Sequence, residues 1–145
     1  MLLEDIGKAG SKKRAKALRD AGVEIPYRDA WTVFIDQTLP DYYQRTLDTY
    51  ESLEQLSPLC RAVLVSLVFN RGTGLEGDRR REMKAIRRLL GEAAAVLPDR
   101  EQAKQILTGV EDQILSMRRL WEPDSALVRR RQAEANLWRE GLAAW

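Results

Sequence analysis

An apolar run near the middle of the chain constrains the fold more than any other feature. The run is 62–69, and Ser66 is its only polar residue. Ser57 and Pro58 precede it, a pair typical of a helix N-cap and first turn. Gly72 follows it, and a left-handed glycine there can end the helix. Because a helix that is apolar on every side is normally wrapped by others, the sequence predicts a buried central helix. The polar residues at its end are a candidate site.

Helical periodicity recurs along the rest of the chain, and no alternating strand pattern occurs. We expect Asp78, and Asp124 or Ser125, to cap helices, Gly91 to end one, and Pro40 to break or kink one. The expected helices are 11–21, 28–50, 79–90, 102–120 and 126–138. The prediction is an all-α protein of roughly seven or eight helices around 57–69. Residues 1–24 would form a peripheral helical segment and 25–145 the helical domain.

Composition excludes several classes of chemistry. The 145 residues contain no histidine and one cysteine, Cys60. The Ser-His-Asp and Cys-His schemes, the usual zinc sets and an internal disulfide are therefore excluded, and we expect no metal or cofactor. Cys60 lies in the apolar helix, where a small core residue is expected.

Arginine runs are concentrated in the second half of the chain, at 79–81, 87–88, 118–119 and 129–131. They are either solvated helix faces or a surface for an anionic polymer. Nucleic-acid binding would give an affinity that falls steeply with salt. The net charge of only +2 disfavours that hypothesis.

The start of the sequence does not resemble a signal peptide, because Glu4 and Asp5 follow Met1-Leu2-Leu3 at once. The apolar run is too short to cross a bilayer, which needs roughly 20 apolar residues. We therefore expect synthesis in the cytoplasm and no membrane span.

Carboxylates are plentiful, but their spacing does not single out a catalytic pair such as glycoside hydrolysis requires. Glu134 follows Arg130 by four residues, so the two can pair along one helix face. The aromatic residues Tyr42, Tyr43 and Tyr50 either stack on a sugar or base or belong to the core. Catalytic residues stay unassigned.

Two segments resemble the phage-type lysozyme (endolysin, muramidase) family. Residues 62–72 are similar to the helix that lines the floor of the cleft in that family, and 127–138 to its terminal helix. Residues 38–42 and 77–83 resemble a bacterial branch of the same group. The resemblance implies the helical lobe of a lysozyme from about residue 25 onward. It also implies peptidoglycan, in the periplasm, as the target.

The resemblance implies a sugar-binding site at Asn70, Arg71 and Arg130. Asn70 would lie at the cleft near bound sugar. Arg130 would correspond to the arginine that pairs with the catalytic glutamate of the family. The alternative interpretation is that Asn70 caps its helix and Arg130 binds Glu134 or solvent.

The catalytic segment of that family has no counterpart here. Its members carry a Glu-Gly helix start, then an Asp and a Thr on a hairpin lobe with a Gly-Tyr-Gly-His-like turn. Glu4 and Glu24 have neither the following glycine nor the hairpin. The first hypothesis is therefore a truncated N-acetylmuramide glycoside hydrolase domain without its general acid, weakly active or inactive alone. The second is a non-catalytic module that binds peptidoglycan or muropeptides, or a protein partner on the face left by the missing lobe.

Overall fold

The computed structural model describes residues 10–145, and every regular element in that range is helical. This confirms the all-α prediction. The α-helices are α1 (Lys12–Asp20), α2 (Tyr27–Val33), α3 (Leu39–Thr49), α4 (Pro58–Arg71), α5 (Arg81–Val96), α6 (Arg100–Ser116) and α7 (Ala126–Ala143). Because a π-helical turn, Phe34–Thr38, joins α2 to α3 without a gap, these seven form six separate segments, slightly fewer than expected. Short 3₁₀ turns cover Leu53–Gln55, Asp78–Arg80 and Met117–Leu120.

The chain divides into two compact units after Thr38, whereas the sequence predicts a helical domain that begins at residue 25. In the described part of the first unit, residues 10–38, no helical side chain is buried. Trp31 and Val33 are each 51% exposed, so the apolar face at 30–35 is not a core face in this structure. The Trp31 ring packs against the rings of Tyr27 and Phe34, with centroid distances of 6.1 and 5.6 Å.

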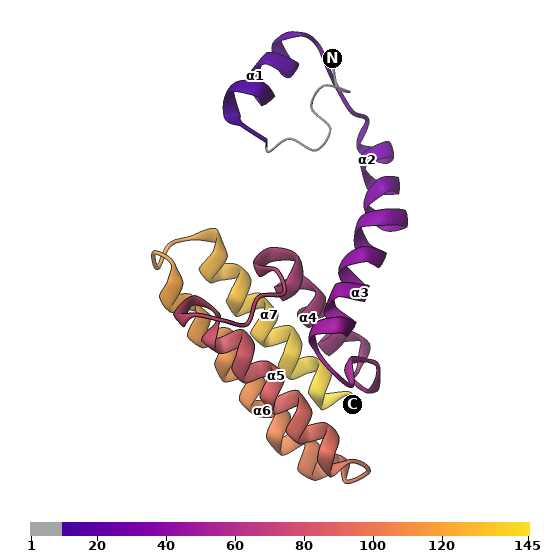
Figure 1. Cartoon of the computed structure of the whole chain (residues 1–145), viewed down its shortest axis with the longest axis vertical. Helices are drawn as coiled ribbons and strands as arrows, with labels where there is room; N and C mark the ends of the chain where they lie inside the picture. Colours follow the sequence, from indigo (N-terminus) through magenta and orange to yellow (C-terminus); the bar gives the residue numbers. More distant parts are fainter. Residues whose placement is uncertain (1–9) are drawn as a thin grey trace. The chain divides into compact units, whose positions relative to one another are not determined.

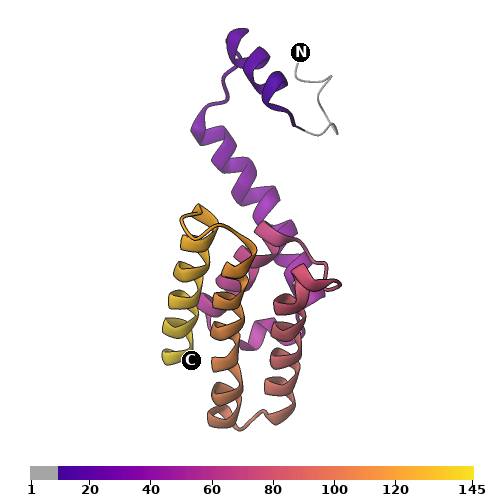
Figure 2. The same ribbon diagram turned by 90° about the vertical axis from the view of Figure 1, so that its left-hand side faces the viewer.

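The second unit, Leu39–Trp145, contains the hydrophobic core and is called the helical unit below. Within it, α5 lies beside α6, α6 beside α7, and α7 beside α4 (Figures 1 and 2). Val63, Leu64 and Leu67 of α4 are fully buried, which confirms a buried central helix. One face of α4 is nevertheless open, because Phe69 is 45% exposed and Ala62 is exposed as well.

Side-chain caps begin three of these helices, and two of the caps are at positions that the sequence predicts. Ser57 Oγ accepts from the Cys60 N–H at 3.3 Å, and Ser125 Oγ accepts from the Leu127 N–H at 3.1 Å. Asp99 caps α6 in the same way, because its carboxylate accepts from the Gln102 N–H at 3.0 Å. The predicted Asp78 cap is wrong, because its carboxylate accepts from arginine side chains instead.

The predicted helix end at Gly91 is wrong, and the predicted break at Pro40 does not occur. Helix α5 continues through Gly91 to Val96 and buries Ala93. An interior glycine costs only about 1 kcal/mol, which further apolar burial offsets. Pro40 is the second residue of α3, and the helical run continues through it, with the π turn Phe34–Thr38 directly before α3.

Gly72 ends α4 in a conformation that differs from the predicted one. Its φ of 75° is positive, as expected, but its ψ of −174° is extended rather than left-handed helical. Its N–H still donates to the Val68 carbonyl at 2.7 Å. This region of the backbone map is essentially restricted to glycine, and here it turns the chain away from the helix axis into the loop that follows.

Candidate ligand-binding site

A pocket of about 530 Å³ lies at the C-terminal end of α4. Its wall is formed by the end of α4, by the loop and 3₁₀ turn that follow, and by Trp121 and Leu127, which lie just before α7 and in its first turn. It is called the arginine pocket below. Its lining residues are Asn70, Arg71, Glu76, Gly77, Asp78, Arg79, Arg80, Trp121 and Leu127. The volume lies within the usual range of small-molecule sites.

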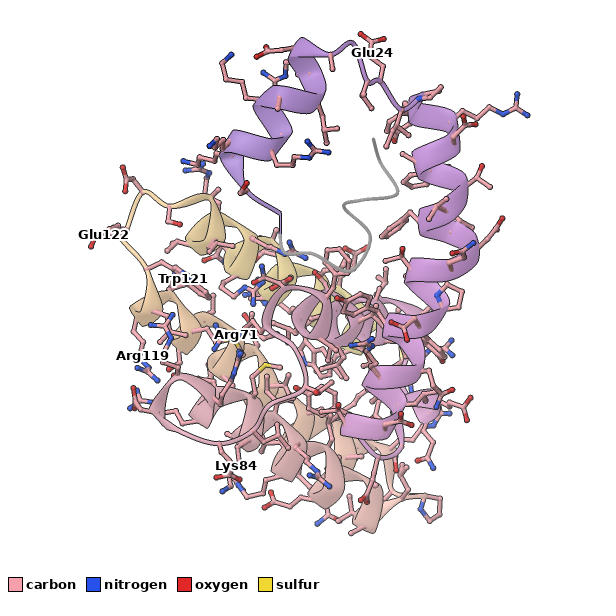
Figure 3. The ribbon with its side chains drawn as sticks, turned by 45° about the horizontal axis from the view of Figure 1, so that its top comes forward. Glu24, Arg71, Lys84, Arg119, Trp121 and Glu122 are labelled. Carbon is pink, nitrogen blue, oxygen red and sulfur yellow. The ribbon has the colours of Figure 1, made fainter. Side chains whose placement is uncertain are left out.

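Arg71 connects the three parts of this wall. Its side chain is buried, its guanidinium lies over the Trp121 ring at 5.4 Å, and one of its terminal N–H groups donates to the Arg79 carbonyl. Figure 3 shows the Arg71 and Trp121 side chains next to each other. Burial, together with the positive charges of Arg80 and Arg131, lowers the pKa of Arg71 to about 10.

Asn70 is half-buried beside Arg71 and lines the same pocket. Its Oδ1 accepts a hydrogen bond from Arg131 Nη2 at 3.3 Å. The Asn70 amide nitrogen is a donor that a ligand in the pocket can use. The structure therefore brings Asn70 and Arg71 together, as the sequence analysis expects of a binding site.

Arg130 does not line the arginine pocket. Its Nη2 donates to Ser66 Oγ at 2.8 Å, and its Nε donates to Glu134 Oε1 at 3.2 Å. Ser66 Oγ itself donates to the same carboxylate oxygen at 2.6 Å. This geometry agrees with the alternative interpretation, in which Arg130 binds Glu134.

Arg131, the next residue, is the buried arginine of this helix and was missed from the sequence. It is fully buried, its Nη2 lies 3.0 Å from Glu134 Oε1, and its guanidinium lies over Trp121 at 5.8 Å. Burial lowers its pKa, and the attraction of Glu134 offsets part of that effect. The available signal was its register, because it shares the apolar face of α7 with Ala135 and Trp138.

Glu82 holds the outer part of the pocket wall in place. It is 1% exposed and accepts from Arg119 Nε at 2.7 Å and from Ser116 Oγ at 3.1 Å. Arg119 also donates to the Asp78 carboxylate at 2.9 Å, so it links α5 to the turn that lines the pocket. Burial on its own would raise the pKa of Glu82, but the hydrogen bonds it accepts, above all from Arg119, hold that pKa below its ordinary value.

The sequence offers two early carboxylates, Glu4 and Glu24, for catalysis. Glu4 lies outside the described residues, and Glu24 is exposed in the link between α1 and α2 (Figure 3). Among residues 10–145, no cluster of three or more His, Cys, Asp or Glu side chains is placed to hold a metal ion. Over the same residues, no helix combines the length and apolar character needed to span a membrane.

Comparisons with models of protein families, with curated proteins and with solved structures give no match. The resemblance to lysozymes therefore rests on the residues quoted above.

Proposed function

We propose that the helical unit is a lysozyme-like domain that binds the glycan strand of peptidoglycan and does not cleave it on its own. The observation that carries this proposal is the arginine pocket, where Asn70 and Arg71 lie together with Trp121. Amide and guanidinium donors suit sugar hydroxyl and N-acetyl groups, and the indole offers an apolar surface for the C–H face of a sugar ring.

The two buried carboxylates, Glu82 and Glu134, do not suit acid catalysis. Acid-assisted glycoside hydrolysis needs a carboxyl group whose pKa is raised, so that it can protonate the leaving oxygen. The pKa of Glu82 is lowered, which is the opposite shift. Glu134 Oε1 accepts from Ser66, Arg130 and Arg131, and its Oε2 lies 2.8 Å from Arg131 Nε, so both oxygens face the cations of the protein itself. Neither residue is therefore suited to act as the general acid.

The proposal is tested by sedimenting the full chain with purified peptidoglycan sacculi and by titrating it with neutral chitooligosaccharides. Asn70→Ala should weaken binding about fivefold, since a hydrogen bond contributes about 1 kcal/mol. The matched control is Asn136→Ala, which removes the same amide from an exposed position of α7 and should bind like the wild type. The turbidity of the sacculi should stay constant.

Three results would contradict this function. The wild-type chain could remain in the supernatant, or Asn70→Ala could bind as tightly as Asn136→Ala. Clearing of the suspension by the wild type would instead support the glycoside hydrolase, the first hypothesis from the sequence.

A further inference from the structure

The charge of the arginine pocket points to a more specific ligand group. Three arginines and two carboxylates line it, which leaves a formal charge of +1. Both carboxylates already have cations of their own. Asp78 Oδ2 lies 2.9 Å from Arg119 Nη1, and Glu76 Oε1 lies 3.6 Å from Lys84 Nζ.

Within residues 10–145, the three lining arginines have no such partner. Among the described residues, no carboxylate forms an ion pair within 4.0 Å of Arg71, Arg79 or Arg80. Arg71 is only 7% exposed, and its buried Nε–H has no hydrogen-bond partner within residues 10–145. A cluster of like charges at a partly buried site is costly, and an anion in the pocket would lower that electrostatic cost.

We propose that the arginine pocket binds one carboxylate group, held by Arg71 and Arg80 beside Trp121. The planar guanidinium matches a carboxylate through paired hydrogen bonds, which makes arginine the side chain of choice for this group. Glu76 and Asp78 line the same pocket, and they would repel a doubly charged phosphate more strongly than a singly charged carboxylate. The proposal goes beyond glycan binding and does not depend on it. Arg71 and Arg80 would bind a carboxylate in the same way whether a sugar or a peptide C-terminus carries it.

The test is an NMR titration of the ¹⁵N-labelled full chain with sodium acetate, with sodium chloride at equal ionic strength as the reference. The chain has four tryptophans, so their indole N–H signals report on four places at once. Acetate should shift the Trp121 signal and leave those of Trp31, Trp138 and Trp145 close to their positions in chloride. Sodium phosphate should bind no more tightly than acetate.

Arg80→Gln should weaken acetate binding about fivefold, because it removes one partly solvated charge from the site. Arg79→Gln is a second pocket variant, at an exposed position, and should also weaken acetate binding. Arg88→Gln makes the same charge change on the exposed side of α5, where Arg88 pairs with Glu92, and should bind acetate like the wild type.

The proposal is overturned if acetate moves the Trp121 signal no more than chloride does. It is also overturned if both pocket variants bind acetate like Arg88→Gln, or if phosphate binds more tightly. If acetate binds as expected, titrations with N-acetylmuramic acid and with N-acetylalanine show whether a sugar or a peptide C-terminus carries the preferred carboxylate. Tighter binding of either one than of acetate supports the site, and N-acetylglucosamine, which has no carboxylate, is the control. Acetate binding without sacculus binding would leave this site in place and refute the proposed function alone.

Discussion

Buried charged side chains give the pocket wall its shape. Glu82 accepts from Arg119, Arg81 and Ser116, and Arg119 in turn holds Asp78 in the turn that lines the pocket. These bonds tie the start of α5 to the chain that follows α6. Loss of the Glu82 charge should therefore loosen the pocket wall as well as lower the stability of the fold.

Glu82 makes stability dependent on pH. Its pKa in the folded chain lies below the ordinary value of 4.5. The stabilisation is thus complete above that ordinary value and is lost as the pH falls through the folded pKa. Glu82→Gln should lower the free energy of unfolding by about 1.5–3 kcal/mol at pH 7, since it removes charged hydrogen bonds. The measurement is urea unfolding of both proteins between pH 3 and 7, and the difference should shrink below about pH 4.5.

Glu140→Gln, at an exposed position of α7, is the control and should keep the pH dependence of the wild type. A Glu82→Gln difference that stays constant down to pH 3 would show that the charge of Glu82 does not stabilise the fold.

The approach of α4 to α7 depends on a glycine in the interior of a helix. A Cβ added to Gly141 would lie 2.7 Å from Cys60 Sγ and 3.0 Å from the Cys60 backbone nitrogen. The Cys60 side chain is held there as well, with Sγ 3.6 Å from the Trp138 carbonyl. Glycine at 141 therefore sets how closely the two helices pack, at a small cost in helix propensity.

Gly141→Ala should lower the free energy of unfolding by about 1–3 kcal/mol, because the added methyl group overpacks this contact. The matched variant is Gly91→Ala in α5, where a Cβ meets nothing within 4 Å. That change should raise stability by about 0.5–1 kcal/mol through helix propensity alone. Chemical unfolding of both variants checks the pair, and equal stabilities would refute the close-packing argument.

The hydrophobic core of the described chain belongs to the helical unit alone. Its buried members run from Tyr50 to Leu142, and no helical side chain among residues 10–38 is buried. Stability of the core should therefore not require the first unit.

A fragment of residues 39–145 should unfold cooperatively, with a Tm within about 5 °C of the full chain, equivalent to roughly 1 kcal/mol. A fragment of residues 58–145, which also lacks the buried Tyr50 and Leu53, should lose the cooperative transition. Thermal unfolding followed by circular dichroism checks both. Loss of cooperativity in the longer fragment would mean that the first unit is needed for the core.

The sequence alone was enough to predict the all-α class, the buried α4 helix and the Ser57 and Ser125 caps. These features depend on local patterns, namely apolar periodicity and a hydroxyl next to the first N–H groups of a helix. The continuation of α5 through Gly91 depended on burial against other helices, which no local pattern contains. The same holds for the site. Asn70 and Arg71 are adjacent in the chain and were predicted together, but Trp121 and Arg131 join them only because the packing of α7 against α4 brings distant residues to one place.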